Sequence, residues 1–201
     1  MITLNSEKLE AFIDAVLAII LTVIVLELPQ PETITLAGFW ALKTNFFAYL
    51  TSFIVVLTNW YFFHIIFEII KKIDGKVIAM TGLLIFIMSL LPYFTVLISN
   101  NFTNLNAQLC YCAFFIVIEL AYDVLFLMII KIEHNKELKK ILNLKRTILH
   151  LLFYAIGIII GMVVTPEIIV VFVFIAVLTW FIHVYLSIKD IDTSNDSNCS
   201  S

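Results

Sequence analysis

The chain has 201 residues, of which 62% are hydrophobic and 13% are charged, and its mean hydropathy is +1.07. Because that charged share is about half the share in a soluble domain, the composition excludes an ordinary soluble protein and indicates an integral membrane protein. The net charge of −3 gives no support for binding to nucleic acid.

The apolar runs are continuous and about 20 residues long, which is the length of a membrane-spanning helix. Strands of a membrane barrel would alternate apolar and polar residues, so we predict an all-α integral membrane protein. Six spanning helices are expected, at residues 8–28, 45–70, 77–99, 107–131, 147–164 and 168–188. They form one domain of residues 1–189, and the polar segment 190–201 is expected to be a disordered tail.

The first helix, residues 8–28, is apolar from Ala11 to Leu26 except for Asp14 and Thr22, and Pro29 ends it. The chain start lacks the basic region and the cleavage site of a signal peptide, so we expect this helix to be retained. A carboxylate inside a span is expensive and marks a functional-site hypothesis. Asp14 therefore needs a partner on another helix or subunit, and His64 is one candidate.

Bulky apolar side chains follow one face of this first helix, because positions three and four apart share a face. The stripe consists of Phe12, Val16, Ile19, Val23 and Leu26, with Thr22 at its edge and Asp14 on another face. From the pattern alone, the stripe either packs inside the helix bundle or faces lipid.

Residues 30–44 are predicted to be a loop with a short interfacial turn at Phe39–Leu42, because Trp40 and Lys43 suit the headgroup boundary. In the third helix Pro92 is expected either to cause a simple kink or to bring nearby hydroxyl groups into contact with ions.

In the second helix Trp60 and His64 lie four residues apart, so their rings share a face and are candidates for a polar network. His64 could equally be a lone core histidine, or it could pair with Glu68. A metal site at His64 is not expected, because Glu68 is the only second ligand at helical spacing.

The fourth helix carries Glu119 and Asp123, which would repel each other if both were charged, so we expect them to face water or to share a proton. Cys110 and Cys112 lie in the same apolar stretch and are expected to be small core residues, without a disulfide framework or a metal. No nucleophile, metal triad or phosphate loop accompanies the carboxylates, so the sequence predicts no enzyme and no cofactor.

The positive charges predict how the chain lies in the membrane. With six spans, eleven of the twelve Lys and Arg residues fall on the side that holds both termini, and only Lys43 falls on the other side. Because Lys and Arg collect on the cytoplasmic side, we expect a multi-pass protein of the cell membrane with both termini in the cytoplasm. The six spans show no internal repeat, so one six-helix unit is expected to build a symmetric oligomer.

The segment KLEAFID resembles the start of the first helix in the transmembrane-protein-175 family of potassium channels, which comprises the lysosomal and endosomal channel and its prokaryotic relatives. Lys8, Phe12 and Asp14 carry this resemblance, whereas Ile13 stands where the family has Ser. The spacing of Trp60 and His64, and a segment with Ser89, Pro92 and Thr95, are also similar to the family. The resemblance is densest over residues 8–28, moderate over 45–99 and only architectural afterwards.

This resemblance implies a prokaryotic, single-repeat member that forms a homotetramer in the lipid bilayer, with the first helix lining the pore. It implies that Ile19, Val23 and Leu26 form the pore constriction and that Thr22 offers a hydroxyl to the ion. The permeant species would be K+ and other monovalent cations. An apolar ring cannot replace the hydration shell, so it would select by width and dehydration cost and favour K+ over Na+ modestly.

Two other functions remain as alternatives. A secondary transporter or proton-coupled permease would use Asp14, His64, Glu119 and Asp123 as its intramembrane titratable groups. A membrane scaffold would transport nothing. Flux against a gradient, ohmic single-channel current and absence of flux distinguish the transporter, the channel and the scaffold.

Overall fold

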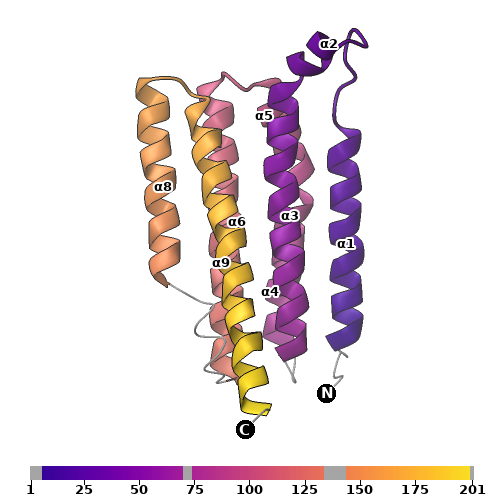
Figure 1. Ribbon diagram of the computed structural model, residues 1–201, viewed down its shortest axis with the longest axis vertical. Helices are drawn as coiled ribbons and strands as arrows, with labels where there is room; N and C mark the ends of the chain where they lie inside the picture. The colour runs from indigo at the N-terminus through magenta and orange to yellow at the C-terminus, as the bar shows by residue number, and fades with distance from the viewer. Residues whose placement is uncertain (1–5, 70–73, 134–143, 200–201) are drawn as a thin grey trace.

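The computed structural model describes residues 6–69, 74–133 and 144–199, and the regular structure within these ranges is entirely helical (Figure 1). The helices are α1 (Ser6–Leu26), α2 (Leu36–Ala41), α3 (Lys43–Ile69), α4 (Gly75–Ser89), α5 (Leu91–Asn100), α6 (Leu105–Glu133), α8 (Leu144–Val163) and α9 (Ile168–Cys199). The predicted all-α fold class is confirmed.

Five apolar helical segments of the described ranges are long enough to cross a membrane: α1, α3, α4 together with α5, α6 and α9. The apolar part of α8, Thr147–Val163, is shorter than these five segments. Figure 1 shows α8 alongside α9 at one edge of an elongated bundle, while α1 lies at the opposite edge. The count of six spans stays a prediction, because it depends on α8.

The third predicted span is divided between α4 and α5. Pro92 lies in the first turn of α5 and has no N–H to donate to the preceding turn. Ser89 Oγ donates to the Phe86 carbonyl at 2.7 Å, and Thr95 Oγ1 donates to the Leu91 carbonyl at 2.7 Å. The proline therefore interrupts the helix, and neighbouring hydroxyl groups bond to backbone carbonyls around the break.

Aromatic side chains fill the interior between α3, α6 and α9. Tyr122 of α6 packs edge-on against Phe62 of α3 and Trp180 of α9, with ring centroids 4.6 and 5.3 Å apart. The Tyr122 hydroxyl also donates to the Asn59 carbonyl at 3.1 Å. These three helices form the centre of the bundle, to which α1 and α8 attach at opposite edges (Figure 1).

α8 packs against α9 through two glycines four residues apart. A Cβ added at Gly157 would come within 2.6 Å of the Phe172 Cβ, and one added at Gly161 would collide with Ile169. Small residues at this spacing let two helix backbones approach closely in a membrane. The glycines therefore explain how the short helix α8 stays close to α9.

The loop between α1 and α3 contains α2, at Leu36–Ala41, where an interfacial turn is predicted at Phe39–Leu42. Thr35 caps α2, because its Oγ1 accepts a hydrogen bond from the Gly38 N–H at 3.2 Å. Lys43 Nζ lies 5.8 Å from the centroid of the exposed Trp40 ring.

The C-terminal segment differs from its prediction. Residues 190–199, expected to be part of a disordered tail, continue α9 as helix. Their Asp, Asn and Ser residues are weak helix formers, but extending an existing helix costs far less than nucleating a new one. Composition alone misses this effect of the long apolar helix that precedes them.

The start of α1 and the end of α9 lie at the same end of the bundle, whereas the start of α3 lies at the other end (Figure 1). Lys8 and Lys76 belong to the first end and Lys43 to the second, as the charge count predicts for an even number of spans. Five of the lysines used in that count lie outside the described residues: Lys71, Lys72, Lys136, Lys139 and Lys140.

Candidate functional site

One face of α1 packs into the protein's own core. Its members are the buried residues Leu9, Ile13, Leu17, Ile20 and Ile24. They recur at helical spacing, and α1 contacts α3, α4 and α5. Ile13, which stands where the resembling family has Ser, is fully buried in this face. An apolar contact therefore takes the place of a hydroxyl here.

The predicted pore stripe lies largely on the outside of the same helix. Ile19 and Leu26 are 61% and 81% exposed, and Phe12 and Val23 are exposed as well. Val16 is only partly buried, at the edge of the core. Burial inside the bundle of a single chain is therefore excluded for these exposed residues, and they face either lipid or another copy of the chain.

An open groove of about 510 Å³ follows this stripe where α1 passes the break between α4 and α5. Its lining residues are Val16, Ile19, Ile20, Val23, Glu27, Ser89, Pro92, Tyr93 and Val96. Thr22 is exposed nearby on α1, and its Oγ1 donates to the Ile19 carbonyl at 2.7 Å. Because the hydroxyl hydrogen is used within the helix, the oxygen lone pairs are left to face outward.

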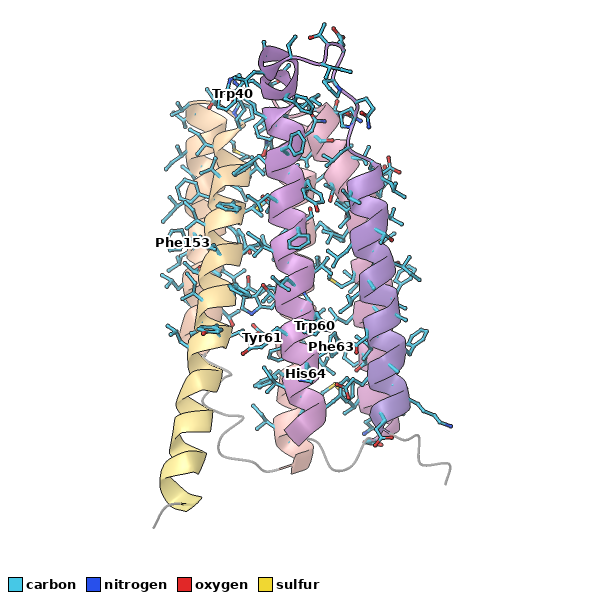
Figure 2. All side chains as sticks on the ribbon, turned by 45° about the vertical axis from the view of Figure 1, so that its right-hand side comes forward. Trp40, Trp60, Tyr61, Phe63, His64 and Phe153 are labelled. Carbon is cyan, nitrogen blue, oxygen red and sulfur yellow. The ribbon has the colours of Figure 1, made fainter. Side chains whose placement is uncertain are left out.

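The motif residues near the start of α1 are arranged differently from the prediction. His64 Nδ1 lies 3.2 Å from Glu10 Oε1, not at Asp14, and the Trp60 ring stacks on the His64 ring with centroids 6.0 Å apart. Figure 2 shows Trp60 and His64 on successive turns in the lower half of α3. Asp14 is half-buried and has no polar partner among the described residues, and Lys8 is exposed.

Thr95 of the proline segment belongs to a buried hydroxyl cluster. Ser52 Oγ lies 2.7 Å from Thr95 Oγ1 and 3.1 Å from the Tyr111 hydroxyl. All three residues are buried, so this cluster joins α3, α5 and α6 inside the chain. Thr95 is therefore a packing residue, whereas Ser89 and Pro92 lie on the open groove.

The carboxylates of α6 each have their own partner on α8. Glu119 Oε1 lies 2.6 Å from His150 Nδ1, and Asp123 Oδ2 accepts a hydrogen bond from Thr147 Oγ1 at 2.6 Å. The expectation that the two carboxylates face water or share a proton is wrong for Glu119, which is buried and paired with His150. Sequence reasoning missed Thr147 and His150, because the register between α6 and α8 is not visible in either helix alone.

No group of three or more His, Cys, Asp or Glu side chains in the described ranges is placed to hold a metal ion. Cys112 is buried in the core, as expected for a small apolar residue, whereas Cys110 is exposed.

The polar contacts between α1 and α3 and those between α6 and α8 form two separate groups. They lie at opposite edges of the bundle (Figure 1).

Comparison with known proteins gives agreement along most of the chain. A family model described as endosomal/lysosomal potassium channel TMEM175 matches residues 8–92. A protein from Chryseobacterium named as a potassium channel is 34% identical over 177 residues, which cover 87% of this chain and 92% of the relative. Another protein named as a potassium channel, from Chamaesiphon minutus, is 30% identical over 125 residues, which cover 58% of this chain and 62% of the relative.

The fold is also similar to a solved structure. The crystal structure of a lysosomal potassium-selective channel TMEM175 homolog from Chamaesiphon minutus matches with a TM-score of 0.75 and 22% identity. The match covers 89% of this chain and 97% of that chain. The fold agrees over nearly the full length, and the Chryseobacterium relative shares a third of its residues over the same extent. The chain therefore belongs to the TMEM175 family of membrane proteins.

Proposed function

We propose that this protein is a potassium-permeable cation channel in which α1 lines the pore of a homotetramer. The observation that carries the proposal is the exposed apolar stripe of α1, which remains open although the opposite face of the same helix is fully packed. A surface of this kind fits contact with other copies around an axis. The names of the two bacterial relatives support potassium as the permeant ion.

Ile19, Val23 and Leu26 would form the constriction of that pore. Their side chains offer no oxygen ligands, so an ion in the neck keeps part of its hydration shell or loses it uncompensated. The dehydration cost is smaller for K+ than for Na+, because the larger ion holds water less tightly. The selectivity expected from such a neck is modest. Thr22, with its hydroxyl hydrogen bonded to the helix, would offer oxygen lone pairs to a passing cation.

The helix arrangement supports a location in the cell membrane, with the start of α1 and the end of α9 on the cytoplasmic side. The start of α1 and the end of α9 lie at the same end of the bundle, and the described lysines favour that end over the one that holds Lys43 (Figure 1). Trp40 and Lys43 near α2 would then mark the outer headgroup boundary.

The four titratable groups of a transporter do not form one site. Glu119 and Asp123 lie between α6 and α8, whereas Asp14 and His64 belong to α1 and α3 at the other edge of the bundle (Figure 1). A coupled carrier that passes one proton or substrate among all four would need contacts that the described chain lacks. This separation favours the channel.

The test is purification, reconstitution into liposomes and planar bilayers, and measurement of the reversal potential between K+ and Na+ solutions. A channel gives ohmic single-channel currents and a reversal potential displaced modestly toward the K+ equilibrium potential. Uptake against a gradient would identify a carrier, and absence of any flux would leave a scaffold.

A further inference from the structure

A buried pair of titratable side chains lies far from α1, between α6 and α8. Glu119 and His150 are each 2% exposed, and Glu119 Oε1 lies 2.6 Å from His150 Nδ1. A net charge buried in this way is costly unless it is neutralised by a partner or by a proton. The proposed channel function makes no use of this pair.

The hydrogen bonds around Thr179 of α9 decide which nitrogen of the His150 ring carries a hydrogen. The Thr179 hydroxyl has one hydrogen, and its Oγ1 lies 2.8 and 3.0 Å from the carbonyl oxygens of Ala176 and Ile175. It lies farther, at 3.2 Å, from His150 Nε2. With its hydrogen donated to the helix, Thr179 can only accept from the ring, so Nε2 carries a hydrogen.

The other ring nitrogen then leaves two arrangements that bury no net charge. Nδ1 either carries a second hydrogen and donates it to an ionised Glu119, or it is bare and accepts the hydrogen of a neutral Glu119. In both cases one proton lies in the 2.6 Å hydrogen bond and the charges of the pair sum to zero. The second carboxyl oxygen, Glu119 Oε2, has no hydrogen-bond partner within the described chain, which also disfavours a carboxylate beside an uncharged ring.

We propose that Glu119 and His150 form a buried proton-binding site between α6 and α8, in which one shared proton keeps the pair uncharged and keeps α8 attached to the bundle. The ligand of this site is a proton. The site lies at the edge of the bundle opposite α1 (Figure 1) and does not depend on what passes along α1.

Other titratable groups lie within four residues of the pair or of Thr179 and must be controlled. They are Tyr122 and Asp123 on α6, Arg146 and Tyr154 on α8, and His183 on α9. Asp123 is the matched control, because it lies one turn from Glu119, is also a carboxylate and also bonds to α8, through Thr147.

Solid-state NMR of the protein in lipid vesicles, with ¹⁵N-labelled histidine, tests the protonation state directly. The chain has four histidines, so the variants His64→Gln, His134→Gln and His183→Gln identify the His150 signals by elimination, without touching the pair. The expected result at neutral pH is a protonated Nε2. A bare Nε2 with a hydrogen on Nδ1 alone would overturn the proposal, because Glu119 would then be an unshared carboxylate.

Thermal unfolding in detergent at neutral pH tests whether the pair keeps α8 attached to the bundle. Glu119→Gln can still hydrogen-bond to His150 Nδ1, whereas Glu119→Ala leaves that buried nitrogen without its carboxyl partner.

The expected result is that Glu119→Ala lowers the unfolding midpoint by more than Glu119→Gln does, and by more than the matched Asp123→Ala does. Equal falls in Glu119→Ala and Glu119→Gln would contradict the proposal. If Glu119→Ala fails to assemble, the NMR measurement on the intact pair decides alone.

Discussion

Ile19 is the residue at which the channel proposal is tested most directly. Its side chain is 61% exposed on the outer face of α1, in the groove beside the α4–α5 break. Ile19→Asn keeps roughly the same bulk and adds hydrogen-bonding groups. We expect the neck to hydrate more easily, so that single-channel conductance rises several-fold and the preference for K+ over Na+ falls. Bilayer recordings with reversal potentials in K+ and Na+ measure both quantities.

The matched control is Ile159→Asn on α8, since Ile159 is 63% exposed at the other edge of the bundle. The neighbouring Ile20 is unsuitable, because it is buried in the chain's own core and an Asn there would damage folding. Conductance that changes equally in both variants would mean a general disturbance. An unchanged Ile19→Asn channel would mean that α1 does not form the constriction.

We expect Asp14 to affect assembly of the oligomer more than permeation of ions. It is half-buried in a membrane-spanning helix and has no polar partner among the described residues, so in an oligomer a neighbouring subunit is the natural source of one. Asp14→Ala should lower the yield of assembled oligomer, measured by size-exclusion chromatography with light scattering, and leave ion selectivity nearly unchanged. Asp14→Asn, which keeps a hydrogen-bonding group, should lose less. Normal assembly with altered selectivity would place Asp14 in the pore instead.

At the scale of elements, α8 depends on its contact with α9. Gly157 faces Phe172 so closely that an added Cβ would come within 2.6 Å of it. Gly157→Ala should therefore push the helices apart and cost about 1–3 kcal/mol of stability, the usual range for an overpacked contact. Gly82→Ala is the control, because that helical glycine has nothing within 4 Å of an added Cβ. A thermal midpoint that falls only in Gly157→Ala supports this contact, and equal midpoints contradict it.

The long helices were predictable because a bilayer requires continuous apolar segments of one length, and α1, α3, α6 and α9 obey that rule. The break at Pro92 was predictable for a different reason. Proline has no N–H, so it removes one hydrogen bond of the helix. The helical segment 190–199 was not, because its polar composition favours disorder and only the preceding helix extends it. The close approach of α8 and α9 had a signal in Gly157 and Gly161, whose spacing went unused.

The candidate site was predictable only in part. The periodicity of α1 separates its faces, but it cannot say which face the rest of the chain covers, and Ile20 rather than Ile19 is the buried one. The pairing of His64 with Glu10 depends on the register between α1 and α3. Register is set by packing over the whole interface and leaves no mark in either helix alone. The same holds for Glu119 and His150.

The whole molecule must also lie in the membrane in one orientation. Asn101 is exposed in the connection between α5 and α6, at the end of the bundle that holds α2, and Asp74 is exposed at the start of α4, at the opposite end (Figure 1). Single cysteines at Asn101, Asp74 and Lys139 are placed in a background without the three native cysteines. An impermeant maleimide applied to intact cells should then label only Asn101→Cys.

Asp74→Cys and Lys139→Cys should react only after the membrane is opened, because the positive residues near them favour the cytoplasm. Lys139 itself lies outside the described residues, so Asp74 provides the check within the structure. If Asp74→Cys reacts in intact cells and Asn101→Cys does not, the chain is inverted. If Asn101→Cys and Lys139→Cys react from the same side, α6 does not cross the membrane, and an even number of spans with both termini in the cytoplasm is wrong.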